Sequence, residues 1–247
     1  IWSGTIRMKA SHNDQQAILE VQRLDDQLAS LAQREATLPE SAALNATTIR
    51  RNNVRDLRIA AETERTDVKR ELSRAEGDVE QIVTRIQRDE ARLNSGTGTP
   101  KELEQTQHEL VTLGQRRAEL EEAELAIMVQ VEGITNRINE LSGEEEKLNA
   151  EIAELEIKKE NALTIIINER TAVSDKRASI AAPIAQDLKD LYTKLAADNN
   201  GNGAAQLVGN ECKGCHLTIN TTEVQRISTL AADEVVRCEE CRCILVR

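Results

Sequence analysis

The chain has 247 residues but almost no aromatic side chains: it contains no phenylalanine, one tryptophan and one tyrosine. Globular cores of this size normally bury many aromatic rings, so the composition excludes an ordinary globular domain and favours long helices. Its 43 acidic residues outnumber 32 basic ones, and the net charge of −11 argues against general attraction to nucleic acid or to anionic membranes, although a local basic patch could still bind them.

The first seven residues, IWSGTIR, differ in character from the rest of the chain. We expect Met8 to be the natural start and residues 1–7 to be a remnant of cloning. The polar stretch after Met8 does not resemble a signal peptide, and the longest apolar run, Ile165–Ile167, is too short to cross a bilayer. We therefore expect a cytoplasmic protein without a membrane partner.

An apolar stripe with alternating steps of three and four runs through residues 8–197. Its first half includes Leu24, Leu28, Leu31, Leu38, Val68, Leu72, Val79, Ile82, Ile86 and Leu93. Its second half includes Leu103, Leu110, Leu113, Leu120, Ile127, Val131, Ile134, Ile138, Leu141 and Leu148. So long a heptad pattern predicts a mostly α coiled coil and argues against disorder.

Turn signals divide this stripe. Gly96 and Gly98 suit a tight turn, and Thr99, Pro100 and Glu102 then have the spacing of a helix start. The sequence TLPE at 37–40 repeats that spacing. We predict helices at residues 11–37, 40–94 and 100–197, with the main turn at 95–99.

The charges indicate that the two halves pair as an antiparallel hairpin. Residues 47–75 hold eight basic and five acidic side chains, and their expected partners, 121–149, hold two basic and eight acidic ones. Opposite charges on neighbouring helices attract and fix the register, here with paired residue numbers that add to roughly 196. Pairing between two chains is the alternative, and the short turn favours pairing within one chain.

A basic cluster on the first half has two interpretations. It could bind nucleic acid, or it could flank the seam opposite acidic residues of the second half. We favour the seam, because the cluster has no aromatic residue on which a base could stack. The cluster consists of Arg50, Arg51, Arg55 and Arg58, opposite Glu140, Glu144, Glu145 and Glu146.

Two C-x-x-C pairs near the end of the chain predict one structural zinc ion. The pairs CKGC and CEEC are separated by 22 residues, and four thiolates suit tetrahedral zinc. Disulfides are rare in the cytosol, a redox C-x-x-C normally lies in a βαβ unit, and an iron–sulfur centre is less common at this spacing. A catalytic zinc needs an open position, which four cysteines close. The candidate ligands are Cys212, Cys215, Cys238 and Cys241.

The ribbon around these cysteines is predicted at residues 212–247, after a flexible linker at 198–211. The stretches HLTI, EVVRC and CILVR predict strands, and NTTEVQRIS predicts a short helix capped by Asn220. Cys243 is a fifth thiol that could replace Cys241 as a ligand, although we favour Cys241. His216 is expected to be a strand residue rather than a ligand.

These features together resemble a known bacterial family, in which a long coiled-coil hairpin precedes a four-cysteine zinc ribbon. The stretches that carry the resemblance are TPKELEQTQHEL, CKGCHLTI, RISTL and VVRCEECRCIL. The resemblance covers Met8–Arg247, is greatest to actinobacterial members, and implies the same four cysteine ligands. Family members usually have Gly-Arg after the last ligand, whereas this chain has Arg242-Cys243.

The resemblance implies a non-enzymatic adaptor or regulator, in some members linked to an alternative sigma factor, flagellar regulation or messenger RNA. The chain has no catalytic constellation or phosphate loop, so we expect no small-molecule substrate. We predict a scaffold for protein–protein interaction, with nucleic-acid binding through the ribbon as the alternative. The candidate contact residues are Thr97, Thr99 and Lys101 at the hairpin tip and Arg226, Arg237, Arg242 and Arg247 in the ribbon.

Overall fold

The structure is a computed structural model that describes residues 8–247, so the prediction for residues 1–7 lies outside it. The predicted fold class is confirmed, since a long helical hairpin precedes a small region of strands. The chain divides into two compact units, one of residues 42–156 and the other of the residues up to Ser41 together with 157–247. Within residues 8–247, no helix combines the length and the hydropathy that a membrane span requires.

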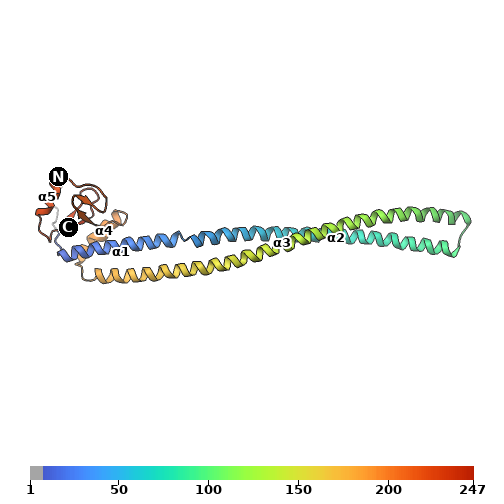
Figure 1. The fold of residues 1–247 in the computed structure, drawn as a ribbon, viewed down its shortest axis with the longest axis horizontal. Coiled ribbons are helices and arrows are strands. Elements are labelled where there is room, and N and C mark those ends of the chain that lie inside the picture. Colours follow the sequence, from blue (N-terminus) through green and yellow to red (C-terminus); the bar gives the residue numbers. More distant parts are fainter. Residues whose placement is uncertain (1–7) are drawn as a thin grey trace. The chain divides into compact units, whose positions relative to one another are not determined.

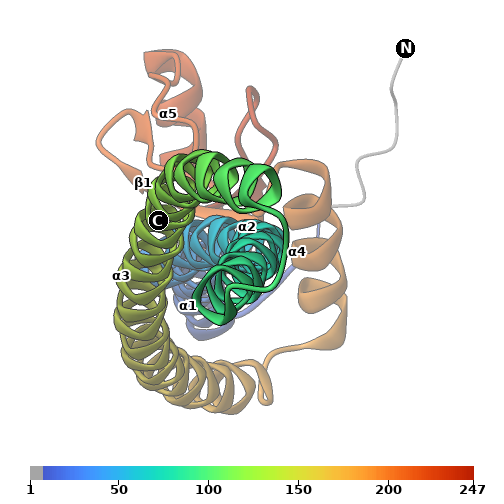
Figure 2. The ribbon, with the colours of Figure 1, turned by 90° about the vertical axis from the view of Figure 1, so that its right-hand side faces the viewer.

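The unit of residues 42–156 consists of parts of two long helices, α2 (Pro39–Ser95) and α3 (Pro100–Ala181). The helices lie side by side and wind about each other (Figures 1 and 2). Their seam is thin, as a core of two helices without aromatic side chains must be. Its buried apolar side chains are Val54, Ala61, Leu113, Ile138 and Leu148.

Ion pairs along this seam define its register. Arg85 pairs with Glu109, and Arg50 with Glu144 at 2.6 Å. The residue numbers add to 194 for both of these pairs and to 203 for the pair of Arg58 with Glu145, on either side of the predicted value of roughly 196. Two arginines of the basic cluster on α2 thus pair with acidic residues of α3, as expected if the cluster flanks the seam, whereas Arg55 pairs with Asp56 of its own helix.

The turn between α2 and α3 is closed by a reciprocal cap. The backbone N–H of Thr99 donates to Glu102 Oε2 at 2.7 Å, and the N–H of Glu102 faces Thr99 Oγ1 at 3.4 Å. Gly96 and Gly98 have φ of 63° and 147°, which side chains disfavour. The turn thus forms where these residues predict it.

The first helix, α1 (His12–Ala36), begins at a Ser11 cap, whose Oγ accepts from the N–H of Asp14. It ends just before α2, with Leu38 buried at the joint against Ile166 of α3. Thr37 does not cap α2 as the sequence suggested. Its hydroxyl donates back to the carbonyl of Gln33 and so closes the end of α1.

The predicted single helix at 100–197 is wrong, because it breaks at residues 182–185. Pro183 lacks an N–H and disfavours helical geometry in the residue before it. The chain restarts as α4 (Gln186–Asp198), which contacts α1. Tyr192 of α4 donates to Asp25 of α1 at 2.7 Å. The break thus directs Leu188 and Tyr192 of α4 toward a buried core, which they share with residues of α1 and the sheet.

The predicted flexible linker at 198–211 is also wrong, because it contains strand β1 (Ala204–Val208) and the start of β2 (Glu211–Cys212). Gly203 precedes β1 and lies so close to α4 that a Cβ there would meet the Tyr192 ring at 2.6 Å. Gly203 is one of the residues that suggested flexibility, and its lack of a side chain instead permits this close approach.

The strands form one sheet of order β2-β1-β4-β3, completed by β3 (Val236–Arg237) and β4 (Ile244–Val246). β1 runs parallel to β4, and the other neighbours are antiparallel. The predicted strand HLTI is reduced to one bridge, between Thr218 and Glu211. The segment before α1 joins the ribbon too, because the N–H of Val235 donates to the carbonyl of Met8.

A short helix, α5 (Thr221–Thr229), lies between the two cysteine pairs. The side chain of Asn220 accepts from the N–H of Thr222 at 3.1 Å, which confirms the predicted cap. Glu223 does not complete a capping box, because it pairs with Arg226 at 2.7 Å.

Candidate metal centre

Each cysteine pair lies in a tight knuckle, and the two knuckles have the same backbone pattern. In the first, the N–H of His216 donates to the carbonyl of Cys212 at 2.8 Å. In the second, the N–H of Arg242 donates to the carbonyl of Cys238 at 3.0 Å. A reciprocal bond closes each knuckle, from Cys212 to Leu217 and from Cys238 to Cys243. The chain thus presents two equivalent pairs of thiols.

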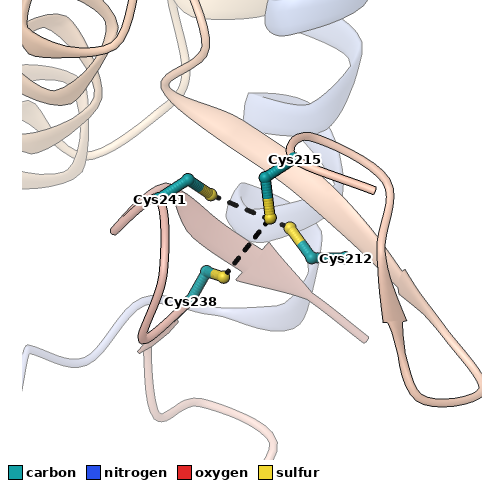
Figure 3. A group of neighbouring side chains, drawn as sticks. All are labelled: Cys212, Cys215, Cys238 and Cys241. Atoms are coloured by element: carbon teal, nitrogen blue, oxygen red, sulfur yellow. Dashed lines mark hydrogen bonds between the residues drawn. The ribbon is translucent and has the colours of Figure 1, made fainter. Parts of the chain in front are cut away.

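The four sulfurs point toward a common centre (Figure 3) and all lie within 4.8 Å of one another. The Sγ atoms of Cys212 and Cys241 are 3.9 Å apart, as are those of Cys215 and Cys238. A tetrahedral zinc ion with Zn–S bonds of about 2.3 Å separates its sulfurs by about 3.8 Å. The four thiols therefore fit one zinc ion by both geometry and donor type.

Burial raises the pKa of Cys241 to about 12 and also raises the pKa of the neighbouring Cys243. A bound metal deprotonates its thiol ligands outright. Metal binding at this centre must therefore release protons.

The residue after each knuckle has a left-handed backbone conformation. His216 has φ of 58° and Arg242 has φ of 63°, a region that glycine occupies without strain. The glycine that the family resemblance implies after the last ligand would adopt this conformation without strain. The His216 ring lies 3.3 Å from Glu211 Oε1 and is exposed, outside the cluster of sulfurs.

The fifth thiol, Cys243, lies inside the ribbon. Its side chain is fully buried, and its Sγ atom is 3.2 Å from that of Cys241 and 3.8 Å from that of Cys212. The sequence placed Cys243 in a strand, whereas β4 begins one residue later.

The arginines singled out in the ribbon differ in their surroundings. Arg226 pairs with Glu223 on its own helix. The guanidinium of Arg247 donates to backbone carbonyls at the end of α5, including that of Ile227 at 2.7 Å. Arg237 and Arg242 are exposed. At the hairpin tip, Thr97 Oγ1 lies 2.9 Å from Ser95 Oγ, Thr99 caps α3, and Lys101 is exposed.

Two buried glutamines of α1 connect the helices to the ribbon, and the sequence analysis missed them. Gln22 Oε1 accepts from the N–H groups of Gly203 and Ala204, at 2.7 and 3.1 Å. Gln15 Nε2 donates to the carbonyls of Ala10 and Ala232, both at 3.0 Å. The sequence does contain a signal for these two residues. Both glutamines share the three-and-four spacing of the apolar α1 residues, and a polar side chain at such a buried position needs a hydrogen-bond partner.

Comparison with known proteins accounts for both parts of the chain. Residues 21–200 match the model of the CT398-like coiled coil hairpin domain, and residues 212–245 match that of the C4-type zinc ribbon domain. The protein Rv2229c of Mycobacterium tuberculosis is 35% identical over 244 residues, which cover 97% of this chain and 98% of the relative.

Solved structures agree with these matches. A structure from Mycobacterium smegmatis is 31% identical, with a TM-score of 0.86 over 97% of this chain and 100% of that one. CT398 from Chlamydia trachomatis is 18% identical and shares the fold, with a TM-score of 0.69 over 95% of this chain and 97% of its own. The resemblance to actinobacterial proteins noted from the sequence is thereby confirmed. The chain belongs to the family of CT398-like coiled-coil hairpin proteins, and its hairpin is followed by a C4-type zinc ribbon.

Proposed function

We propose that this protein is a non-enzymatic cytoplasmic adaptor, whose hairpin binds a protein partner and whose ribbon has a structural zinc ion. The observation that supports this most is an exposed apolar patch on α3, formed by Leu125, Met128 and Val129. Their exposed fractions are 61%, 47% and 67%. Apolar side chains so exposed and so close together often mark protein interaction sites.

The charge around the patch indicates the chemistry of the partner. Four acidic side chains lie within one or two helical turns of it: Glu121, Glu122, Glu124 and Glu132. A helix with an apolar stripe and basic flanks would complement this surface, since a helix commonly binds another protein through such a stripe. The family resemblance suggests that the partner belongs to transcription-related regulation.

We assign the zinc ion to Cys212, Cys215, Cys238 and Cys241. Four thiolates leave no open position for substrate, so this ion would stabilise the ribbon rather than catalyse a reaction. In a domain with so small a core, metal binding would supply much of the folding free energy.

Nucleic-acid binding through the ribbon is the weaker candidate. Of the four arginines proposed for it, Arg226 and Arg247 are held by groups of the protein itself, which leaves Arg237 and Arg242. Residues 205–247 hold five basic and six acidic side chains, whereas phosphate binding relies on clustered positive charge.

The test is capture of the full-length protein with its partners from native cytosol, with and without nuclease. The variant L125Q/V129Q should lose a protein that the wild type retains after nuclease treatment. The matched control is I157Q, which changes an equally exposed side chain of α3 outside the patch and should retain that protein. Retention by all three proteins would reject the patch. Partners that disappear with nuclease would favour nucleic-acid binding, whose affinity should also fall steeply with salt.

A further inference from the structure

The ribbon contains five thiols, although a tetrahedral zinc ion binds four. Cys243 Sγ lies 3.8 Å from Cys212 Sγ, the separation of about 3.8 Å expected between two ligands of one zinc ion. It lies 3.2 Å from Cys241 Sγ, which is too close for both to occupy separate corners of the tetrahedron. Cys241 and Cys243 are therefore alternatives for one corner.

A buried cysteine can also serve as a small apolar core residue. Comparison of the two equivalent knuckles distinguishes the role of Cys243 as a metal ligand from its role as a core residue. Leu217 occupies the position of Cys243 in the first knuckle and is 50% exposed, so this position does not itself require a buried side chain. Cys243 instead turns its sulfur inward, into contact with two sulfurs of the centre.

The backbone already holds Cys243 in place for such a role. The hydrogen bond from the N–H of Cys238 to the carbonyl of Cys243, at 2.9 Å, places the two residues across the knuckle from each other. Ligation by Cys243 would therefore need a local adjustment of the second knuckle and no unfolding of the ribbon. With Cys243 as the ligand, the second pair would have the spacing C-x4-C, and this bond brings its two ends together.

We propose that Cys243 is a reserve zinc ligand, which takes the corner of Cys241 when the Cys241 thiolate is lost or blocked. Cys241 is partly exposed and open to thiol-reactive compounds, whereas Cys243 is fully buried. The exchange keeps four thiolates on the metal. The ribbon thus tolerates modification at Cys241 and not at Cys238, the other ligand of its knuckle.

The experiment compares four variants of the full-length chain: C241S, C243S, C241S/C243S and C238S. Cobalt(II) is substituted for zinc, because its thiolate charge-transfer and d–d bands report how many sulfurs bind. C241S and C243S should each keep the wild-type four-thiolate spectrum and one zinc ion after a chelator challenge. The double variant and C238S should show fewer thiolates and lose zinc to the chelator.

A three-thiolate spectrum for C241S would overturn the proposal. An altered spectrum for C243S would also overturn it, because Cys243 would then bind the metal in the wild-type protein. A wild-type spectrum for the double variant or for C238S would overturn it as well. A second measurement avoids variants that fold poorly: zinc-loaded wild-type protein is treated briefly with iodoacetamide and examined by native mass spectrometry and peptide mapping. Chains labelled once, at Cys241, should keep their zinc, and loss of zinc from those chains would reject the proposal.

Discussion

His216 and Arg242 each follow the second cysteine of a knuckle and have φ near +60°. A residue with a Cβ pays a conformational penalty there of about 1–2 kcal/mol. The bonds from their N–H groups to the first cysteine of each knuckle fix this conformation, so the strain is a consequence of bringing two thiols to one side. Glycine would relieve it, although glycine also makes the unfolded chain more flexible.

We predict that R242G stabilises the zinc-loaded protein by about 1 kcal/mol, because relief of the left-handed strain outweighs the entropy of glycine. Urea unfolding of the zinc-loaded protein measures the change. The control is R237G, in strand β3, where φ is not left-handed and glycine should destabilise the protein by about 0.5–1 kcal/mol. Equal effects of the two substitutions would contradict this account of Arg242.

The buried amide of Gln22 gives a second prediction. In Q22L the N–H groups of Gly203 and Ala204 lose a buried acceptor, and each unsatisfied group costs about 1–3 kcal/mol. We expect at least about 2 kcal/mol of destabilisation in urea. The matched control Q27L changes an exposed glutamine of the same helix and should have little effect. Similar unfolding midpoints for both variants would show that the Gln22 bonds contribute little.

At the scale of elements, local signals predicted much of the fold and long-range pairing explains the rest. Apolar spacing, Gly96, Gly98 and the Thr99 cap are signals within a few residues, so the hairpin turn was predictable. Strand β1 exists because Ala204 pairs with Ile244, far along the chain, and its own small residues gave no strand signal. Pro183 did offer a local signal for the break, which the continuous apolar stripe around it obscured.

The candidate metal centre was likewise predictable from local sequence only in part. The C-x-x-C pairs predicted the four thiols, because spacing alone places two cysteines in one knuckle. The contact of Cys243 with Cys212 depends on how β4 packs against β1, and no local pattern encodes it. Nor does local sequence reveal that Gln15 and Gln22 face the ribbon, since their partners lie about two hundred residues away.

The cap of α3 predicts a pH response at the hairpin turn. Hydrogen bonds from the backbone N–H and the hydroxyl of Thr99 lower the pKa of Glu102 below 4.5. A lowered pKa means that the carboxylate stabilises the folded turn fully above pH 4.5, and that this contribution is lost as pH falls through the lowered value. The protection factors of amides at the start of α3, which correct for the intrinsic pH dependence of exchange, should therefore fall in acid.

The variant E102A lacks this carboxylate and should show lower protection factors already at neutral pH, with less further change in acid. The control E104A alters an exposed neighbour and should keep the wild-type response. Carboxyl NMR titration of Glu102 gives the pKa directly. A value at or above 4.5 would contradict the cap as the cause.

The charge pattern of the seam can be tested by exchanging a pair. Arg58 donates to Glu145 at 2.8 Å, and both side chains are mostly covered. R58E should lower the thermal midpoint because like charges then face each other, and R58E/E145R should restore much of it. The exchange at Arg70 and Asp67, which pair on one exposed helix face, serves as the control with little expected change. Absence of any rescue would reject this register of α2 against α3.

At the scale of the whole molecule, the ribbon is part of a larger folded unit. Its sheet shares a buried core with α1 and α4, formed around Ile18, Leu188 and Ile244. Gln15 and Gln22 add buried hydrogen bonds across the same contact. The segment before α1 pairs with residues next to β3. The ribbon and the end of the hairpin near α1 therefore depend on each other for stability.

Zinc removal should consequently affect only one of the two compact units. Metal binding to four thiolates contributes about 10–16 kcal/mol in small zinc domains, so chelation should unfold the ribbon and loosen α4 and the start of α1. Residues 60–140, in the other unit, have a seam of their own and should stay protected. Hydrogen exchange with mass spectrometry distinguishes these regions.

The expected result is fast exchange at residues 8–22 and 186–246 after chelation, with unchanged exchange at 60–140 and recovery when zinc is restored. The variant C215S should reproduce the metal-free pattern without a chelator, which controls for chelator effects. Exchange that accelerates only within 212–246 would show that the ribbon folds apart from α1 and α4. Acceleration along the whole hairpin would show that the two units unfold as one.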